Sequence, residues 1–275
     1  MRRSALYVPA DRPDRITKVW SGSGGSAPDV VIADLEDGVA ASARPAARSA
    51  LAALLDQRPS ATVPLYVRLG GVAALEADLE VLAGRHVDGW YWPKAEPASL
   101  ELLDRALTAA GRTEPVVALV ESAAGVLAAA ELAVHHRVER LGLGEADLVA
   151  DLGVDPGPDG EELLVARSTV VLAAAAAGIE GPSGPASTDF HDLMALERSS
   201  GTLRRLGFTG RSCIHPAQVA VVNRAFAPTE AAIAAARELV AAFDAAVAAG
   251  EGVVVGPDGR MVDEAVARRA RRLLG

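Results

Sequence analysis

The sequence has very little cysteine, few basic residues and no long hydrophobic run. Its one cysteine, Cys213, excludes an intrachain disulfide framework and a zinc site built from several cysteines. No apolar stretch approaches the roughly 18 residues that a membrane-spanning helix needs, and the stretch after Met1-Arg2-Arg3 is too short for the core of a signal peptide. The 27 basic residues are outnumbered by 36 acidic ones, for a net charge of −9. Such a chain is a poor candidate for binding nucleic acid or an anionic membrane. We therefore expect a globular, cytoplasmic protein that binds neither.

Motifs for binding nucleotide phosphates are also missing. There is no Gly-Lys-Ser/Thr sequence, and Gly142-x-Gly144-x-x-Asp147 lacks the third glycine of a dinucleotide-binding fingerprint. The only low-complexity segment is Ser21–Ser26, which we interpret as a flexible loop rather than a phosphate cradle.

Short apolar segments alternate along the chain with segments of helical periodicity. The predicted strands are Ala5–Val8, Val30–Ala33, Leu65–Arg68, Gly89–Trp92, Val116–Val120, Arg140–Leu143, a segment around Ile179, and Ser212–Ile214. The predicted helices are Ala46–Leu55, Ala74–Leu82, Ala98–Ala110, Gly125–His135, Glu161–Ala177 and Leu193–Leu206. This alternation is typical of a parallel α/β fold. A doubly wound sheet fits it too, but the strand count and the placement of the polar residues favour a TIM (β/α)8 barrel.

The tail of the chain has a different pattern. Thr229-Glu230 is predicted to cap a helix that runs to about Ala249. Gly250–Val255 and a turn at Gly256–Gly259 lead into a last helix near Asp263–Leu274. We therefore expect a TIM-barrel catalytic domain at residues 1–227 and a C-terminal helical extension at residues 228–275.

Ionisable side chains follow six of the predicted strands. In a parallel barrel the catalytic groups lie at the face where the strands end. The residues that this rule places there are Asp34, Glu36, Asp37, Arg68, Lys94, Glu121, Asp147 and His215. Because an unpaired buried charge is costly, this concentration predicts one polar site.

Glu121 and Asp147 follow neighbouring strands, the fifth and the sixth. Two carboxylates placed in this way can share a hard divalent cation and leave positions for water and substrate, which is how Mg²⁺ is usually held. The alternative is a pair of acids at helix N-termini, where the helix dipole favours negative charge. Glu145 is a competing ligand, but in a continuing strand it would face away from the partners of Asp147.

Two cationic side chains complete the predicted site. Arg68 has a planar guanidinium suited to a carboxylate. Alternatively it pairs with the Asp34–Asp37 cluster, and the two roles can coexist. Lys94 is one of only two lysines in the chain, and its position indicates a role for a compact ammonium in substrate binding. His135 and His136 are interpreted as surface residues.

Six short motifs occur in an order that points to one enzyme family. They are Arg3–Ala10, Asp34–Val39, Trp92–Lys94, Glu121–Gly125, Gly144–Leu148 and Ile214–Gln218. With them the chain resembles the citrate lyase β-subunit-like (CitE-like) proteins of the HpcH/HpaI aldolase superfamily, close to the malyl-CoA and citramalyl-CoA lyases. The resemblance covers nearly the whole chain. It implies a TIM barrel, dependence on Mg²⁺ (Mn²⁺ being a possible substitute), and a homo-oligomer that is a trimer or a hexamer.

Carried over by position, the resemblance makes Glu121 and Asp147 the metal ligands, which also contact the substrate. Arg68 would bind the substrate carboxylate and act in catalysis. Glu36 and Asp37 would be supporting catalytic groups.

The resemblance also assigns residues around this centre. The backbone at Ala146 would form part of the oxo-acid pocket, and Arg12 or Arg15 and His215 would line the path of coenzyme A. The C-terminal extension would pack on a neighbouring subunit, so that Asp263 caps the partner's active site and exchanges a proton at the thioester α-carbon. The alternative is that Asp263 is an ordinary helix N-cap.

The predicted activity is that of a Mg²⁺-dependent oxo-acid lyase. It would cleave a short 3-hydroxy-dicarboxylyl-CoA of the malyl, citramalyl or citryl type into a 2-oxo acid and an acyl-CoA. One alternative is a malate-synthase-like or thioesterase activity at the same site. Others are a β-subunit that acts only within a citrate lyase complex on an acyl carrier protein, and a non-catalytic binding protein for oxo acids.

Overall fold

The computed structural model describes residues 2–23, 25–60, 63–157, 160–256 and 259–274. The chain divides into two compact units, Met1–Phe226 and Ala227–Gly275. The first unit contains every residue predicted at the strand ends, and the second contains Asp263.

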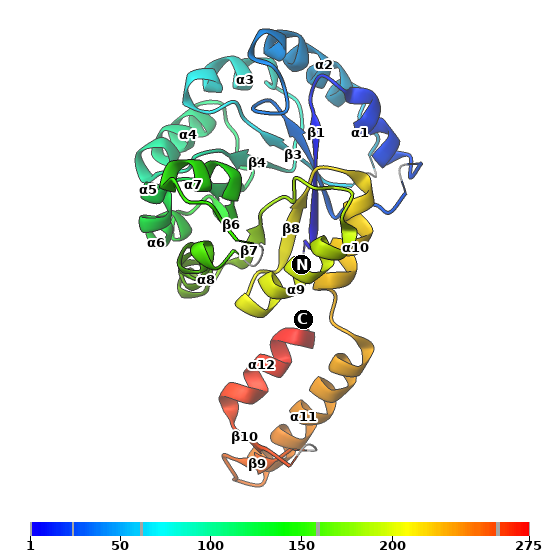
Figure 1. The fold of residues 1–275 in the computed structure, drawn as a ribbon, viewed down its shortest axis with the longest axis vertical. Helices are drawn as coiled ribbons and strands as arrows, with labels where there is room; N and C mark the ends of the chain where they lie inside the picture. Colours follow the sequence, from blue (N-terminus) through cyan, green and yellow to red (C-terminus); the bar gives the residue numbers. More distant parts are fainter. Residues whose placement is uncertain (1, 24, 61–62, 158–159, 257–258, 275) are drawn as a thin grey trace. The chain divides into compact units, whose positions relative to one another are not determined.

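Eight parallel strands close into a barrel in the first unit (Figure 1). They are β1 Ser4–Pro9, β2 Val30–Asp34, β3 Leu65–Arg68, β4 Gly89–Trp92, β5 Val116–Val120, β6 Val138–Leu143, β7 Glu180–Gly184 and β8 Gly210–Cys213. The pairing of β1 with β8, which places Ser4 opposite Arg211, decides between the two predicted folds. A doubly wound sheet has two open edges, whereas here every strand has two neighbours. The predicted TIM (β/α)8 barrel is confirmed.

Helices surround the barrel (Figure 1). They are α1 Pro13–Trp20, α2 Arg44–Asp56, α3 Leu75–Val81, α4 Pro97–Ala109, α5 Ala123–Leu127, α6 Ala129–Ala133, α7 Glu145–Leu152, α8 Leu164–Ala177, α9 Leu193–Leu206 and α10 Pro216–Phe226, with short 3-10 turns at Ala41–Ala43, Val72–Ala74 and Glu161–Leu163. The sequence does not predict α1, α7 and α10. They have 8, 8 and 11 residues. The predicted helix Gly125–His135 is two short helices that meet at Ala128.

Strand β7 depends on a contact that is distant in sequence. Its residues, Glu-Gly-Pro-Ser-Gly, have low strand propensity. The buried guanidinium of Arg140 donates hydrogen bonds to the carbonyl oxygens of Gly181 at 2.8 Å and Pro182 at 3.3 Å. Because a residue of another strand stabilises β7, and not its own strand propensity, the sequence gives only a weak signal for the strand, around Ile179.

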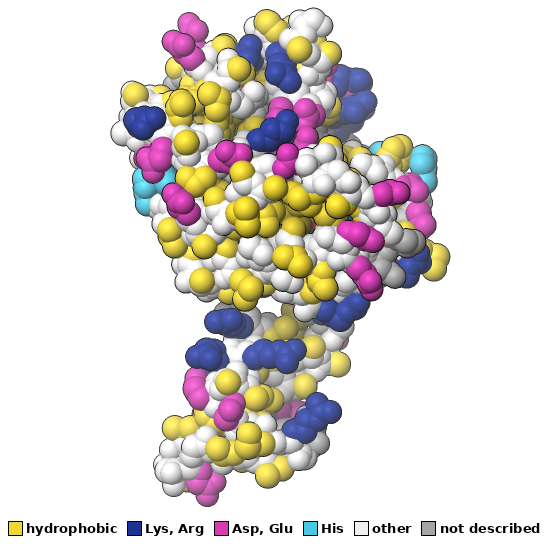
Figure 2. All heavy atoms as spheres, turned by 60° about the vertical axis from the view of Figure 1, so that its left-hand side comes forward, with side chains coloured by type: hydrophobic (Ala, Val, Ile, Leu, Met, Phe, Trp, Pro, Cys, Tyr) yellow, Lys and Arg dark blue, Asp and Glu magenta, His cyan; other side chains and the backbone are white. Residues whose placement is uncertain are grey.

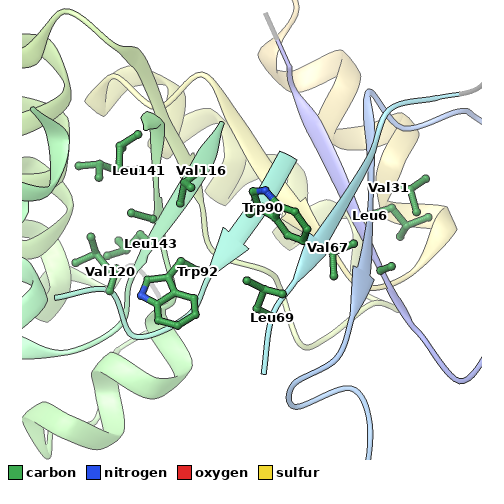
Figure 3. Packing of buried hydrophobic residues seen from close by; sticks show 14 of the residues in the cluster. Leu6, Val31, Val67, Leu69, Trp90, Trp92, Val116, Val120, Leu141 and Leu143 are labelled. Atoms are coloured by element: carbon green, nitrogen blue, oxygen red, sulfur yellow. The ribbon is translucent and has the colours of Figure 1, made fainter. Parts of the chain in front are cut away.

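Successive strand residues face opposite sides of the barrel wall. One set fills the interior, and its members are Ala5, Val30, Ile32, Tyr66, Tyr91, Val117 and Leu119. The alternate set, which includes Trp90 and Trp92, packs between the strands and the helices (Figure 3). Because both faces are buried, the strands are almost continuous apolar runs in the sequence. This close-packed wall fixes the positions of the strand ends.

The second unit has its own small core. It consists of α11 Glu230–Ala248, a hairpin of β9 Val254–Val255 and β10 Met261–Val262, and α12 Glu264–Leu274. Phe243, Val262 and Ala267 are packed together in it. The sequence does not predict the hairpin, and residues 257 and 258 of the predicted turn lie outside the described residues. The packing of this unit on a neighbouring subunit stays a prediction.

Among the described residues, no helix combines the length and the apolar character needed to span a membrane.

Candidate active site

The guanidinium of Arg68, at the end of β3, is the centre of a polar rim. It donates to Asp34 from Nε to Oδ1 and from Nη2 to Oδ2, both at 2.7 Å. Its Nη1 lies 2.8 Å from Glu36 Oε2 and 3.5 Å from Asp37 Oδ2. Asp34 also accepts the backbone N–H groups of Glu36 and Gly38. Arg68 is therefore paired with the acidic cluster, and one N–H on Nη2 is left for another partner.

Glu121, directly after β5, is held by two backbone contacts. Its Oε2 accepts the backbone N–H of Lys94 at 3.0 Å. It also lies against Gly144, where an added Cβ would be 2.4 Å from Glu121 Oε1. Lys94 has a φ of 46°, the only positive φ among the described non-glycine residues. Such backbone strain is concentrated at functional sites in proteins.

Asp147 completes the group from the first turn of α7. The Lys94 ammonium lies 3.7 Å from Asp147 Oδ1 and 3.9 Å from Glu36 Oε1. The backbone of the same lysine contacts Glu121. Lys94 therefore joins carboxylates from three segments that are far apart in the sequence.

Glu145 does not belong to this group. The predicted strand Arg140–Leu143 ends where β6 ends, and Glu145 begins α7. Its carboxylate accepts two hydrogen bonds from Arg167, at 2.6 and 2.9 Å. Glu145 thus faces away from the partners of Asp147, as expected, but because it lies in a helix that directs it toward α8 and not in a continuing strand.

Burial dominates the electrostatics of the two glutamates. It raises the pKa of Glu36 to about 7, against the opposing charge of Arg68. It also raises the pKa of Glu121 to about 7, against the hydrogen bond from Lys94. Burial lowers the pKa of Lys94, but Asp147 and Glu36 raise it, and it ends above its usual value. The negative charge of the ionised carboxylates therefore exceeds the positive charge of the neighbouring cations. A bound metal cation would favour the ionised forms.

A cavity of about 410 Å³ opens onto this group, and we call it the active-site cavity. Arg68, Glu121, Ala146 and Asp147 line it. So does Tyr7, which the sequence analysis did not single out. The Tyr7 ring centroid lies 5.0 Å from the Arg68 guanidinium carbon. The only feature of the sequence that indicates a functional role for Tyr7 is its place in the Arg3–Ala10 motif.

A cavity of about 320 Å³ shares part of this lining. Arg15, Lys18 and His215 line it, and Arg15 lines the active-site cavity as well. Arg12 has a different environment, since its Nε lies 3.6 Å from Asp14 Oδ1 on the exposed surface. Of the two arginines considered for the coenzyme A path, the structure thus places Arg15 at the cavities.

Asp263 belongs to the second unit. Its Oδ1 accepts the backbone N–H of Val266 at 2.9 Å, directly before α12. This is the geometry of a helix N-cap. A role for Asp263 at a partner's active site stays a prediction.

The model of the HpcH/HpaI aldolase/citrate lyase family matches residues 3–216. The chain belongs to this family. The citrate lyase subunit beta-like protein of Mycobacterium tuberculosis strain H37Rv is 38% identical over 277 residues, which cover 98% of this chain and 93% of the relative. A (3S)-malyl-CoA thioesterase of Cereibacter sphaeroides is 34% identical, with coverage of 99% and 93%. Among solved structures, CitE from M. tuberculosis in complex with magnesium, acetoacetate and coenzyme A has a TM-score of 0.80 and 34% identity, with coverage of 99% and 97%.

The predicted resemblance to citrate lyase β-subunit-like proteins is confirmed. The expected enzyme class, an oxo-acid lyase, and the expected cofactor, Mg²⁺, agree with this family and with the ion in the solved relative. The strand-end residues that the sequence analysis selected all lie in the part of the chain that the family model covers, whereas Asp263 lies beyond it.

Proposed function

We propose that this citrate lyase-family chain is a Mg²⁺-dependent carbon–carbon lyase. Its substrate would be a short 3-hydroxy-dicarboxylyl-CoA of the malyl, citramalyl or citryl type, split into a 2-oxo acid and an acyl-CoA. The observation that carries the proposal is the joint placement of Glu121, Asp147 and Arg68 on one cavity at the strand ends. Carboxylates suit a hard cation, and a guanidinium suits the carboxylate of an oxo acid.

The residues at this cavity fit a magnesium ion held by Glu121 and Asp147. Both residues supply only oxygen ligands, which Mg²⁺ and Mn²⁺ prefer. We therefore expect that the activity does not need zinc. Glu121 is buried and has a pKa of about 7, so its ionised form lacks a partner that a divalent ion would supply. The Lys94 ammonium beside Asp147 shows that positive charge is favourable there. A bound Mg²⁺ would supply Lewis-acid stabilisation of oxygen atoms on the substrate.

Arg68 would bind the carboxylate of the 2-oxo acid. Two hydrogen bonds of 2.7 Å that it donates to Asp34 fix the plane of its guanidinium, and Nη1 forms an ion pair with Glu36. The remaining N–H on Nη2 is then oriented before the substrate arrives, which lowers the cost of positioning it. Lys94 would add a second positive charge on the Asp147 side of the site.

The acyl-CoA part of the substrate would use the cavity lined by Arg15, Lys18 and His215. The positive charges of Arg15 and Lys18 suit the phosphates of coenzyme A. Because Arg15 also lines the active-site cavity, a thioester reaching from one cavity to the other would bring its acyl group toward Glu121 and Asp147. The solved relative with coenzyme A supports this use of the fold.

Thioester hydrolysis at the same site is the second candidate, and the relative named (3S)-malyl-CoA thioesterase favours it. Malyl-CoA separates the two reactions, since lysis yields glyoxylate and intact acetyl-CoA whereas hydrolysis yields malate and free CoA. A malate-synthase-like enzyme would instead release free CoA from glyoxylate and acetyl-CoA. Activity of the purified chain alone on free CoA thioesters would exclude a subunit that works only in a citrate lyase complex.

A homo-oligomer, a trimer or a hexamer, is also part of this proposal. Leu127 of α5 and Val165 and Leu172 of α8 are 88%, 76% and 69% exposed, and α5 contacts α8. Figure 2 shows hydrophobic side chains gathered on the face of the barrel unit that it brings forward. An apolar patch of this kind is typical of a protein interface. Val165→Asp should reduce the mass measured by light scattering, whereas Val72→Asp, at a 52% exposed position of a 3-10 turn, should not.

The test of the lyase assignment is a panel of hydroxyacyl-CoA thioesters assayed with Mg²⁺. Glu121→Gln and Asp147→Asn should each abolish cleavage while the circular dichroism spectrum stays unchanged. Glu76→Gln removes an exposed acid from α3 and is the matched control. Near wild-type turnover in either site variant would show that the site assignment is wrong.

A further inference from the structure

A third cavity, of about 440 Å³, lies next to the active-site cavity. Residues of α7, α8, α9 and β8 line it, and we call it the Arg211 cavity after one of them. The residues that line both cavities are Glu145, Ala146, Pro185, Ala186 and Thr188. Neither the proposed metal ligands nor Arg68 line the Arg211 cavity. The proposed lyase reaction therefore leaves this cavity without a role.

Arg211 of β8 is a buried cation, and one nitrogen of its guanidinium lacks a hydrogen-bond partner in the described part of the chain. Its Nε donates to the Pro185 carbonyl at 2.7 Å, and its Nη1 donates to the hydroxyls of Ser199 at 2.8 Å and Ser200 at 3.1 Å. Only 6% of the residue is exposed. Among the described residues its Nη2 has no hydrogen-bond partner. This atom is also not fully enclosed by the protein. Nη2 is therefore open to the cavity that Arg211 lines.

The charge of Arg211 is not neutralised where it lies. No carboxylate of a described residue forms an ion pair with it, although Glu145 stabilises its charge from a distance. Burial lowers its pKa to about 10, so the guanidinium remains charged at neutral pH. A buried charge normally has a partner because desolvation is costly. Structural ties from β8 to α9 and to Pro185, directly after β7, account for Nη1 and Nε but not for the open Nη2.

The other charges around the cavity are also mainly positive. Arg198 of α9 lines it and has no ion-pair partner among the described residues. Arg167 lines it too, in a pair with Glu145. Glu145 is the only acid in the lining that the structure describes. Three arginines therefore face one glutamate, in a chain whose net charge is −9.

We propose that the Arg211 cavity is a binding subsite for a small oxyanion, a carboxylate or a phosphate group, held by Arg211 and Arg198. The ligand would supply the negative charge that Arg211 lacks, in a cavity partly shielded from water, where a charge-assisted hydrogen bond is strong. The hydroxyls of Ser199 and Thr202 line the same cavity, but they donate to the carbonyl oxygens of Ala195 and Arg198, so the two arginines would hold the ligand. The proposal does not depend on the lyase reaction, since it requires none of the residues at the proposed metal centre.

Calorimetric titration with sodium phosphate and with sodium succinate tests the proposal. The protein is kept in EDTA at constant ionic strength, so that the metal centre does not contribute. Arg198→Gln should weaken binding about tenfold, because a hydrogen bond between charged groups is lost. Arg204→Gln is the matched control, since Arg204 lies on the same helix but outside the cavity lining. The Arg204→Gln variant should bind the two anions with the affinity of the wild-type chain.

The two anions identify the source of the ligand. Binding of succinate alone supports a carboxylate subsite, binding of phosphate alone supports a phosphate subsite, and binding of both supports a general oxyanion site. Binding of neither by the wild-type chain overturns the proposal, as does equal affinity in Arg198→Gln and Arg204→Gln. Arg211→Lys should weaken binding at least as much as Arg198→Gln. If that variant does not fold, the comparison of Arg198→Gln with Arg204→Gln decides alone.

Discussion

Substitution of Gly144 by alanine should damage the proposed metal centre without removing any of its ligands. Gly144 lies between β6 and α7 with φ at −103°, a conformation that alanine adopts freely. An added Cβ would lie 2.4 Å from both Cγ and Oε1 of Glu121 and 2.8 Å from its Cδ. The effect of Gly144→Ala therefore comes from this contact and not from backbone strain.

The size of the effect follows from these distances. Carbon contacts in proteins begin at about 3.5 Å, so the Glu121 side chain must move by about 1 Å. It is 5% exposed and has little free space, and overpacking a buried site costs about 1–3 kcal/mol of unfolding free energy. A misplacement of about 1 Å in a reacting site costs about a hundredfold in rate, and displaced supports of a metal ligand cost about 10- to 100-fold in affinity.

Calorimetric titration of Mg²⁺ into the metal-free protein is the assay. We expect Gly144→Ala to bind Mg²⁺ about 10- to 100-fold more weakly than the wild-type chain. Gly201→Ala is the control, since its Cβ on α9 would meet only Arg205, at an ordinary 3.6 Å. Wild-type Mg²⁺ affinity in Gly144→Ala would refute the reasoning, because it would show that the position of Glu121 does not control the metal.

The remaining predictions concern the same centre and the C-terminal unit. Arg68→Lys should weaken calorimetric binding of oxaloacetate, pyruvate or glyoxylate with Mg²⁺ about tenfold or more, because an ammonium cannot replace a planar guanidinium; unchanged affinity would leave Arg68 with a structural role. In metal-free protein the free energy of unfolding should fall as pH rises from 4.5 to about 7, since the folded pKa values of Glu36 and Glu121 lie above 4.5 and the folded state binds more protons there. Urea unfolding at pH 5 and pH 8 measures this, and an equal pH dependence in Glu121→Gln would contradict it. Asp263→Ala should abolish turnover, keep binding of Mg²⁺ and oxo acid, and regain activity in mixed oligomers with an Arg68-deficient chain. Full activity of the single variant would show that Asp263 is only a helix cap.

Local sequence was sufficient to locate most of the barrel strands because both faces of each strand are buried, whereas the closure of the barrel was decided by the pairing of β1 with β8. Leu65–Arg68, Gly89–Trp92 and Val116–Val120 are predicted with the bounds that the structure has. Their apolar residues are continuous, so neighbouring turns and helices mark the ends clearly. The signal is weak at β7, where a glycine- and proline-containing segment is held by the distant Arg140.

The sequence also predicted which ionisable residues lie near one another, because the carboxyl ends of parallel strands meet at one face. It predicted the pairing of Arg68 with the Asp34–Asp37 cluster only as an alternative, and it could not predict which atoms meet. Arg68 is shared by Asp34, Glu36 and Asp37, and Lys94 reaches Asp147, through side-chain directions that depend on register between strands. The same limit applies to Tyr7, whose position next to Arg68 depends on the register of β1, β2 and β3.

The amino-acid sequence by itself thus determined the order of the eight barrel strands and the set of polar residues at the strand ends, since both follow from the local pattern of apolar and charged residues. The tertiary structure alone decided that Glu145 turns to Arg167 and that Arg211 has an open Nη2 beside α9. These features join residues from different helices and strands. Their geometry depends on how those elements pack, and no short stretch of sequence contains that information.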